Sequence, residues 1–130
     1  LTLTAKAQYT FQQALDVTSR DDSFYRDQIP YVARHSGSAA LLSRWGEWGL
    51  DCSFIYTGER YSQQENIVYN YVQPWYTTDV SALRDIALPR GAGSLRLQVE
   101  VNNLLDQDYD VIINYPMPGR NVRVTARYTL

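Results

Sequence analysis

Three aspartates in one short segment have the spacing at which carboxylates begin a calcium-binding loop. Asp106, Asp108 and Asp110 alternate along the chain, and calcium takes oxygen ligands of this type. Such a loop also needs glycine at its sixth position and glutamate at its twelfth. Here those positions hold Val111 and Met117. The segment is better interpreted as a solvated turn after a strand, and we expect no metal site.

Two further patterns could belong to an enzyme. Gly91-Ala92-Gly93 begins like a dinucleotide fingerprint, but the third glycine position is Arg96 and a strand pattern follows instead of a helix. His35 is the single histidine and has Ser36 and Ser38 beside it. No Gly-x-Ser-x-Gly elbow accompanies them, so a hydrogen-bonded structural histidine is the simpler interpretation.

The lone cysteine, Cys52, falls on an apolar phase of its segment and is expected to pack as a small hydrophobe. It has no second cysteine with which to form an internal disulfide. Since no acid, base and nucleophile converge in the sequence, we predict that the chain is not an enzyme and binds no cofactor.

Composition narrows the class of protein. The chain has 130 residues, 45% hydrophobic content and a net charge of -2, without a basic run. This excludes a phosphate-neutralising surface, so we expect no nucleic-acid partner. No apolar stretch is long enough for a transmembrane helix. The chain starts without methionine inside an alternating segment and has no signal peptide, which suggests a piece of a longer protein or a processed product.

Alternation with a period of two is the main structural signal. It is clearest in the last stretch, 120–130, which also ends on the apolar phase. Its apolar set is Val122, Val124, Ala126, Tyr128 and Leu130. The other strands are predicted at 1–12, 33–45, 48–60, 75–86 and 95–103. The fold class is therefore all-β, an antiparallel up-and-down meander of about six long strands.

The connections and the aromatic residues suggest a membrane barrel. Long loops at 16–30, 61–74 and 104–119 alternate with short turns at 45–49 and 89–94, as they do in transmembrane barrels. Aromatics fall at both strand ends, as interface girdles do. Trp45, Trp48 and Tyr128 lie at the short-turn end, and Tyr9, Phe11, Tyr56, Trp75 and Tyr76 lie at the long-loop end.

Charges of both signs occupy the polar phase of these strands. They suit a wide aqueous lumen. They also suit the solvent face of a soluble sheet, so the pattern leaves both interpretations open. The soluble alternative is an all-β ligand- or carbohydrate-binding module with sandwich topology.

Two motifs near the C-terminus bear on this choice. The sequence Asn103-Leu104-Leu105-Asp106-Gln107-Asp108-Tyr109, followed by Pro118-Gly119-Arg120 and an alternating strand, resembles the C-terminal end of a TonB-dependent outer-membrane receptor. The segments 29–37 and 56–61 are similar to stretches found earlier in the same barrels. Members of this family usually end in an aromatic residue. This chain ends in Leu130, so either recognition by the barrel-assembly machinery is weaker or Tyr128 carries it.

The resemblance implies that residues 1–130 are the C-terminal part of a 22-stranded barrel, without the plug domain. It implies a location in the outer membrane of a Gram-negative bacterium and a role in active uptake of an iron–siderophore complex, haem or cobalamin. The implied partners are outer-membrane lipid, the rest of the barrel and its plug, the TonB complex acting through that missing plug, and the barrel-assembly machinery. Loop tyrosines are candidate ligand contacts, although loop packing and interface anchoring are the simpler role for them: Tyr25, Tyr31, Tyr61, Tyr69 and Tyr71.

Overall fold

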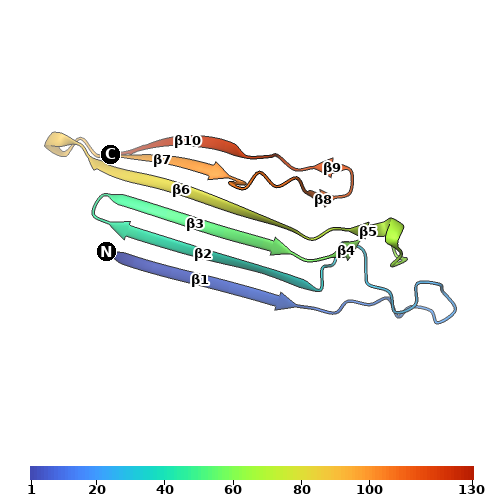
Figure 1. The fold of residues 1–130 in the computed structure, drawn as a ribbon. Coiled ribbons are helices and arrows are strands. Elements are labelled where there is room, and N and C mark those ends of the chain that lie inside the picture. Colours follow the sequence, from blue (N-terminus) through green and yellow to red (C-terminus); the bar gives the residue numbers. More distant parts are fainter.

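The computed structural model describes residues 1–130 and contains one six-stranded antiparallel sheet (Figure 1). Its strands are β1 (Thr2–Phe11), β2 (His35–Trp45), β3 (Trp48–Thr57), β6 (Trp75–Ala87), β7 (Ser94–Asn102) and β10 (Asn121–Thr129). They lie in the order β1-β2-β3-β6-β7-β10, so each pairs with its neighbour in sequence. The predicted meander of six long strands is confirmed.

Short elements within the long connections were not predicted. β4 (Arg60–Tyr61) pairs with β5 (Tyr71–Val72), and β8 (Asp110–Ile112) pairs with β9 (Tyr115–Pro116). Strands this short carry no readable alternation. Two single-turn helices, η1 (Val68–Asn70) and η2 (Pro89–Gly91), complete the elements. Neither is long or apolar enough to cross a bilayer.

The two ends of the sheet differ. Both chain termini and the short β2–β3 and β6–β7 turns lie at one end, and the three long connections lie at the other (Figure 1). Gly93 is required in the β6–β7 turn because its φ is 91° and an added Cβ would lie 2.1 Å from the carbonyl oxygen of Thr129. We call these the short-turn end and the long-loop end.

The register of the sheet keeps apolar residues in phase across all six strands. Leu41 lies opposite Ala5 on β1 and opposite Cys52 on β3, and Val99 lies opposite Ala82 and Val124. Directly opposed residues point to the same face of a sheet. The sheet therefore has one apolar face and one polar face. The polar face carries Lys6, Arg44, Asp51, Asp79, Asp85, Arg96, Glu100, Arg123 and Arg127.

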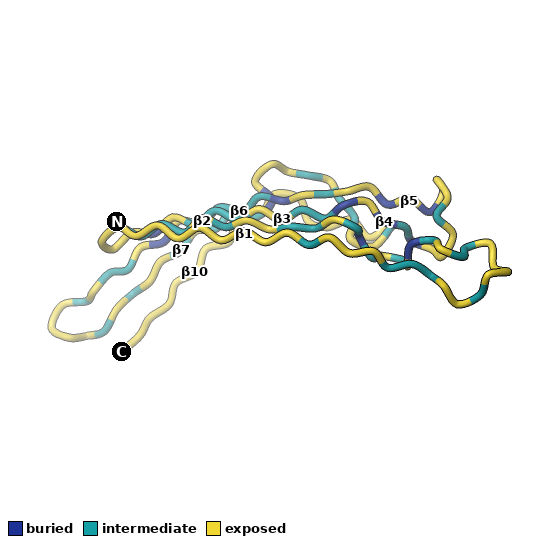
Figure 2. The backbone as a smooth tube through the Cα atoms, turned by 90° about the horizontal axis from the view of Figure 1, so that it is seen from below, coloured by how far each residue is buried: buried dark blue, intermediate teal, exposed yellow.

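The apolar face packs against nothing within the chain. Only 11 of 130 residues are buried, and Val124 on the apolar face is 70% exposed. Seen along its edge, the sheet is a single layer, with the buried residues gathered mainly toward the long-loop end (Figure 2). A soluble sandwich would cover this face with a second sheet. The single layer instead has the form of a piece of barrel wall.

Candidate functional site

The long connections are joined by one buried arginine. Arg60, on β4, is only 2% exposed. Its Nη1 donates to the carbonyl oxygen of Gln73 at 3.2 Å, and its Nη2 donates to the carbonyl oxygens of Asp110 and Val111 at 2.6 and 2.9 Å. Burial lowers the pKa of Arg60. This guanidinium therefore holds the 104–119 loop against the 61–74 loop using backbone acceptors alone.

The motif around Asn103 is a second loop anchor. Asn103 is 4% exposed and has φ of 51°, a conformation that asparagine tolerates better than most residues. Its Nδ2 donates to the carbonyl oxygen of Gln107 and its Oδ1 accepts from the Gln107 N–H, both at 2.9 Å. Its own N–H donates to Asp79 on β6 at 2.8 Å. The side chain of Asn103 thus closes the turn after β7, and its backbone N–H ties that turn to the polar face.

Asp106 and Asp110 are also occupied in shaping this loop. Asp106 Oδ1 accepts from the Arg120 N–H at 2.7 Å, and Asp110 Oδ2 accepts from the Asn114 N–H at 3.0 Å. An added Cβ on Gly119 would lie 3.0 Å from Asp106 Oδ1, which explains glycine in the Pro-Gly-Arg segment. These contacts agree with the interpretation of the acidic run as a turn.

Between these two loops lies a hollow of about 420 Å³. Trp75 and Tyr109 line it and stack with their ring centroids 4.7 Å apart. Tyr71, Met117 and Asp108 also contribute to its wall. Burial, followed by the charge of Asp79, raises the pKa of Tyr109. The hollow combines aromatic surface with a few polar groups, the usual character of a small-molecule site.

Two buried donors at the long-loop end have no acceptor, Trp75 Nε1 and Arg34 Nε. Buried N–H groups are normally paired, and an orphan is a sign of a missing partner. Both are donors, so the group that would satisfy them must carry oxygen or nitrogen acceptors. Neither donor was identified from the sequence pattern.

Trp75 lies on a different face from the other strand aromatics that are expected at the membrane interface. Trp75 lies opposite Thr57 on β3, one residue out of phase with Tyr76, which lies opposite Tyr56. Trp75 is therefore on the polar face, where it stacks on Tyr109, whereas Tyr76 is on the apolar face. The alternation along β6 already separates these two neighbours, so the sequence contained the signal.

The other aromatics of the strands lie on the apolar face by their register. At the long-loop end, Tyr9 donates its hydroxyl to, or accepts from, His35 Nδ1 at 2.7 Å, and the Phe11 ring lies 5.3 Å from the imidazole. His35 is thus one of an aromatic group on the apolar face, and adjacent Ser36 points to the opposite face. The remaining aromatics of this face are Trp45, Trp48, Phe54, Tyr56, Tyr76 and Tyr128.

The loop tyrosines are not gathered at one place. Tyr61 and Tyr71 pair edge to face across β4 and β5, with centroids 6.0 Å apart. Tyr71 lines the hollow, and burial together with Glu59 raises its pKa. Tyr31 lines a smaller neighbouring hollow beside Arg60. Tyr25 and Tyr69 line neither, and Tyr69 is 89% exposed.

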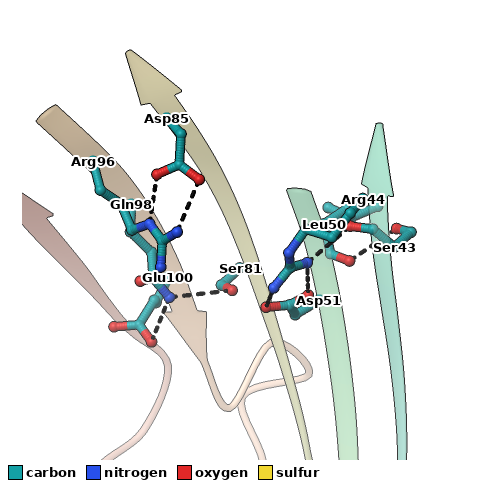
Figure 3. A network of polar contacts seen from close by, with 9 residues as sticks. All are labelled: Ser43, Arg44, Leu50, Asp51, Ser81, Asp85, Arg96, Gln98 and Glu100. Atoms are coloured by element: carbon teal, nitrogen blue, oxygen red, sulfur yellow. Dashed lines mark hydrogen bonds and ion pairs between the residues drawn. The ribbon is translucent and has the colours of Figure 1, made fainter. Parts of the chain in front are cut away.

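The polar face is covered with ion pairs between neighbouring strands (Figure 3). Arg96 on β7 makes a two-pronged contact with Asp85 on β6 at 2.6 and 2.8 Å, and Arg44 on β2 makes another with Asp51 on β3. Arg123 pairs with Glu100. Such exposed pairs add little stability one by one. They do make this face hydrophilic along its whole length, which suits contact with water or with a polar domain.

Known proteins are similar in sequence and in fold to this sheet with one apolar and one polar face. The sequence model of the family "TonB dependent receptor-like, beta-barrel" matches residues 1–104. A solved structure of the ferric citrate transporter FecA, in its unliganded form, is similar with a TM-score of 0.82 over 95% of this chain. At 17% identity this likeness concerns the fold. No curated protein sequence matches the chain.

This chain spans only 20% of the length of that transporter, as a segment of a larger barrel would. The family match ends at Leu104, so most of the Asn103–Tyr109 motif lies beyond it, whereas the structural likeness covers nearly the whole chain. The six-stranded antiparallel sheet agrees with a family of β-barrels. The chain belongs to the TonB-dependent receptor β-barrel family.

Proposed function

We propose that this chain forms part of the barrel wall of an outer-membrane receptor that takes up a scarce nutrient. The observation that carries the proposal is the single-layer sheet, whose apolar face is uncovered over its whole width while its polar face holds the ion pairs. An uncovered apolar surface of this extent marks a contact with lipid or with a partner. In a barrel it meets lipid, and the polar face lines the lumen.

The rest of the receptor would supply the segments that move during transport. The polar face would lie against a plug domain, and the inner-membrane energy source would act on that plug through TonB. β1 and β10 each have an unpaired edge, which the remaining strands of the barrel would cover. The alternating residues of β10 are the surface that the barrel-assembly machinery would recognise. The chain itself would make and break no bond.

The long-loop end is the proposed site of ligand contact. The hollow beside Trp75 and Tyr109 has aromatic walls, and Trp75, which lines it, has an unpartnered N–H that suits a ligand with exposed oxygen acceptors. Iron–siderophore complexes, haem and cobalamin all present such acceptors on a large, partly apolar body. The family and the printed name of its structural relative, a ferric citrate transporter, favour an iron complex among these.

A fractionation experiment on the complete parent receptor tests the location. We expect the receptor in the outer-membrane fraction, and recovery in the cytoplasm or free in the periplasm would rule the proposal out. Cells lacking the receptor should then lose uptake of one labelled nutrient, which is radioactive iron for a siderophore or haem source and radioactive cobalt for cobalamin.

Binding by variants tests the ligand site. Trp75→Leu combined with Tyr109→Leu should weaken ligand binding by about tenfold, because two aromatic contacts are lost. The matched control is Tyr69→Ala, since Tyr69 is an exposed loop tyrosine that lines neither hollow. Equal affinity of the double variant and the control would place the ligand elsewhere.

A further inference from the structure

One arginine breaks the pattern of the apolar face. Every other charged residue of the six-stranded sheet belongs to the polar face, but Arg84 lies opposite Trp48 on one side and Leu97 on the other, in the apolar phase. A charge facing hydrocarbon is unfavourable unless its head group reaches the interface or an anion. Arg84 lies in the part of β6 nearest the short-turn end. From there its side chain needs to extend only a short way to bring the guanidinium to the interface.

The Arg84 guanidinium has two close neighbours, an aromatic ring and a carboxylate. Its guanidinium lies 4.9 Å from the centre of the Trp48 ring, a cation–π contact. Trp45 lies directly opposite Trp48, and both indoles are more than two-fifths exposed. Arg84 Nη2 also lies 3.6 Å from Glu47 Oε2.

Glu47 is held in place by the turn that contains it. Gly46 takes φ of 56°, and the carbonyl oxygen of Glu47 accepts the Asp85 N–H at 2.8 Å, which fixes the β2–β3 turn to β6. The ion pair itself remains open, with side chains 45% and 57% exposed. The result is a fixed cation and a fixed anion side by side, bordered by two indoles, at the edge of an apolar surface.

We propose that this cluster binds the head group of a zwitterionic phospholipid with a primary ammonium, of the phosphatidylethanolamine class, in the periplasmic leaflet. The Arg84 guanidinium donates charge-assisted hydrogen bonds to the phosphate. The Glu47 carboxylate accepts hydrogen bonds from the ammonium. The indoles of Trp45 and Trp48 cover the glycerol and the upper acyl chains. The proposal rests on the barrel-wall function, since only a membrane-embedded sheet brings lipid to this face.

The test uses the complete parent receptor, purified from outer membranes in mild detergent and exposed to equal amounts of phosphatidylethanolamine and phosphatidylglycerol. Native mass spectrometry then counts the lipid that each variant retains. The wild-type receptor should retain phosphatidylethanolamine over phosphatidylglycerol by about tenfold, the ratio expected from one hydrogen-bonded charged contact. Arg84→Gln should abolish this retention, Arg84→Lys should restore part of it, and Glu47→Gln should remove the preference between the two lipids.

Arg127→Gln is the matched control, because Arg127 is an arginine near the same end on the polar face. It should leave lipid retention unchanged. Equal retention by the wild type and Arg84→Gln, or a preference that survives Glu47→Gln, would overturn the proposal. Failure of the wild-type receptor to reach the outer membrane at all would instead overturn the barrel-wall function on which the proposal rests.

Discussion

The six-stranded wall and the long-loop end are stabilised in different ways. The wall has its strand ladder and pairs of exposed charges but buries almost no side chain, whereas most of the buried residues lie in or beside the long connections. There the chain buries polar groups such as Arg60 and Asn103 and satisfies them with backbone partners. The wall therefore leaves its apolar face and its two edge strands without partners in this chain, while the loop end holds itself together. Each prediction below perturbs one side of this contrast.

The largest effect is expected on the apolar face of the wall. Val99→Arg on β7 would place a charge against lipid and should destabilise the parent barrel by about 2–4 kcal/mol. Gln98→Arg, the adjacent position on the polar face, should change stability little. Urea unfolding of the receptor from phospholipid vesicles measures both. Equal effects of the two variants would mean that the faces do not meet different surroundings.

The next effect belongs to the loop end alone. Arg60→Met removes the donor shared by three backbone carbonyls and should destabilise the loop contacts by about 1–3 kcal/mol. Hydrogen exchange should quicken in the 61–74 and 104–119 loops and stay unchanged in β6 and β7. Arg60→Lys should recover little, because a single ammonium cannot reproduce the fork. Hydrogen exchange that quickens equally throughout the wall would contradict the proposal that the long-loop end is stabilised independently of the wall.

Asn103 tests the junction between the two regions. Asn103→Ala loses the side-chain contacts to Gln107 and keeps a strained φ, which should lower stability by about 1–2 kcal/mol. Asn103→Gly loses the same contacts but relieves the strain, so it should be the milder variant. Asn102→Ala, one residue earlier on β7, is the control. Thermal unfolding of the parent receptor ranks the three, and an Asn102→Ala variant as unstable as Asn103→Ala would remove the special role of Asn103.

The smallest expected effect is a loss of stability in the loops at alkaline pH. The raised pKa of Tyr109 means that burial, followed by the charge of Asp79, favours the neutral phenol in the folded chain. This contribution is complete below the unfolded pKa of about 10 and is lost as pH rises through the higher folded value. Absorbance titration should show one late-ionising tyrosine that disappears in Tyr109→Phe. A titration curve unchanged by that substitution would show that Tyr109 is not the late group.

Much of the wall was predictable from sequence. An alternation with a period of two indicates both that a segment is a strand and which face of the sheet each residue occupies. The phase of Val122 and Val124 on β10, for instance, fixes their side of the sheet. The loop end was not predictable in the same way. The Arg60 contact to Val111 spans 51 residues and ends on a backbone carbonyl, which no side-chain pattern reports. Trp75 was grouped with the interface aromatics because it lies near a strand end, although its phase along β6 indicates the polar face.

The common end of the two termini has a consequence for engineering and for the history of such barrels. Six is an even number of strands, and the chain enters and leaves at the short-turn end (Figure 1). Segments with this property can be duplicated, removed or exchanged between related receptors as whole hairpins, without reversing the direction of any strand that remains. Barrel circumference can therefore change in steps of two strands while every external loop stays external.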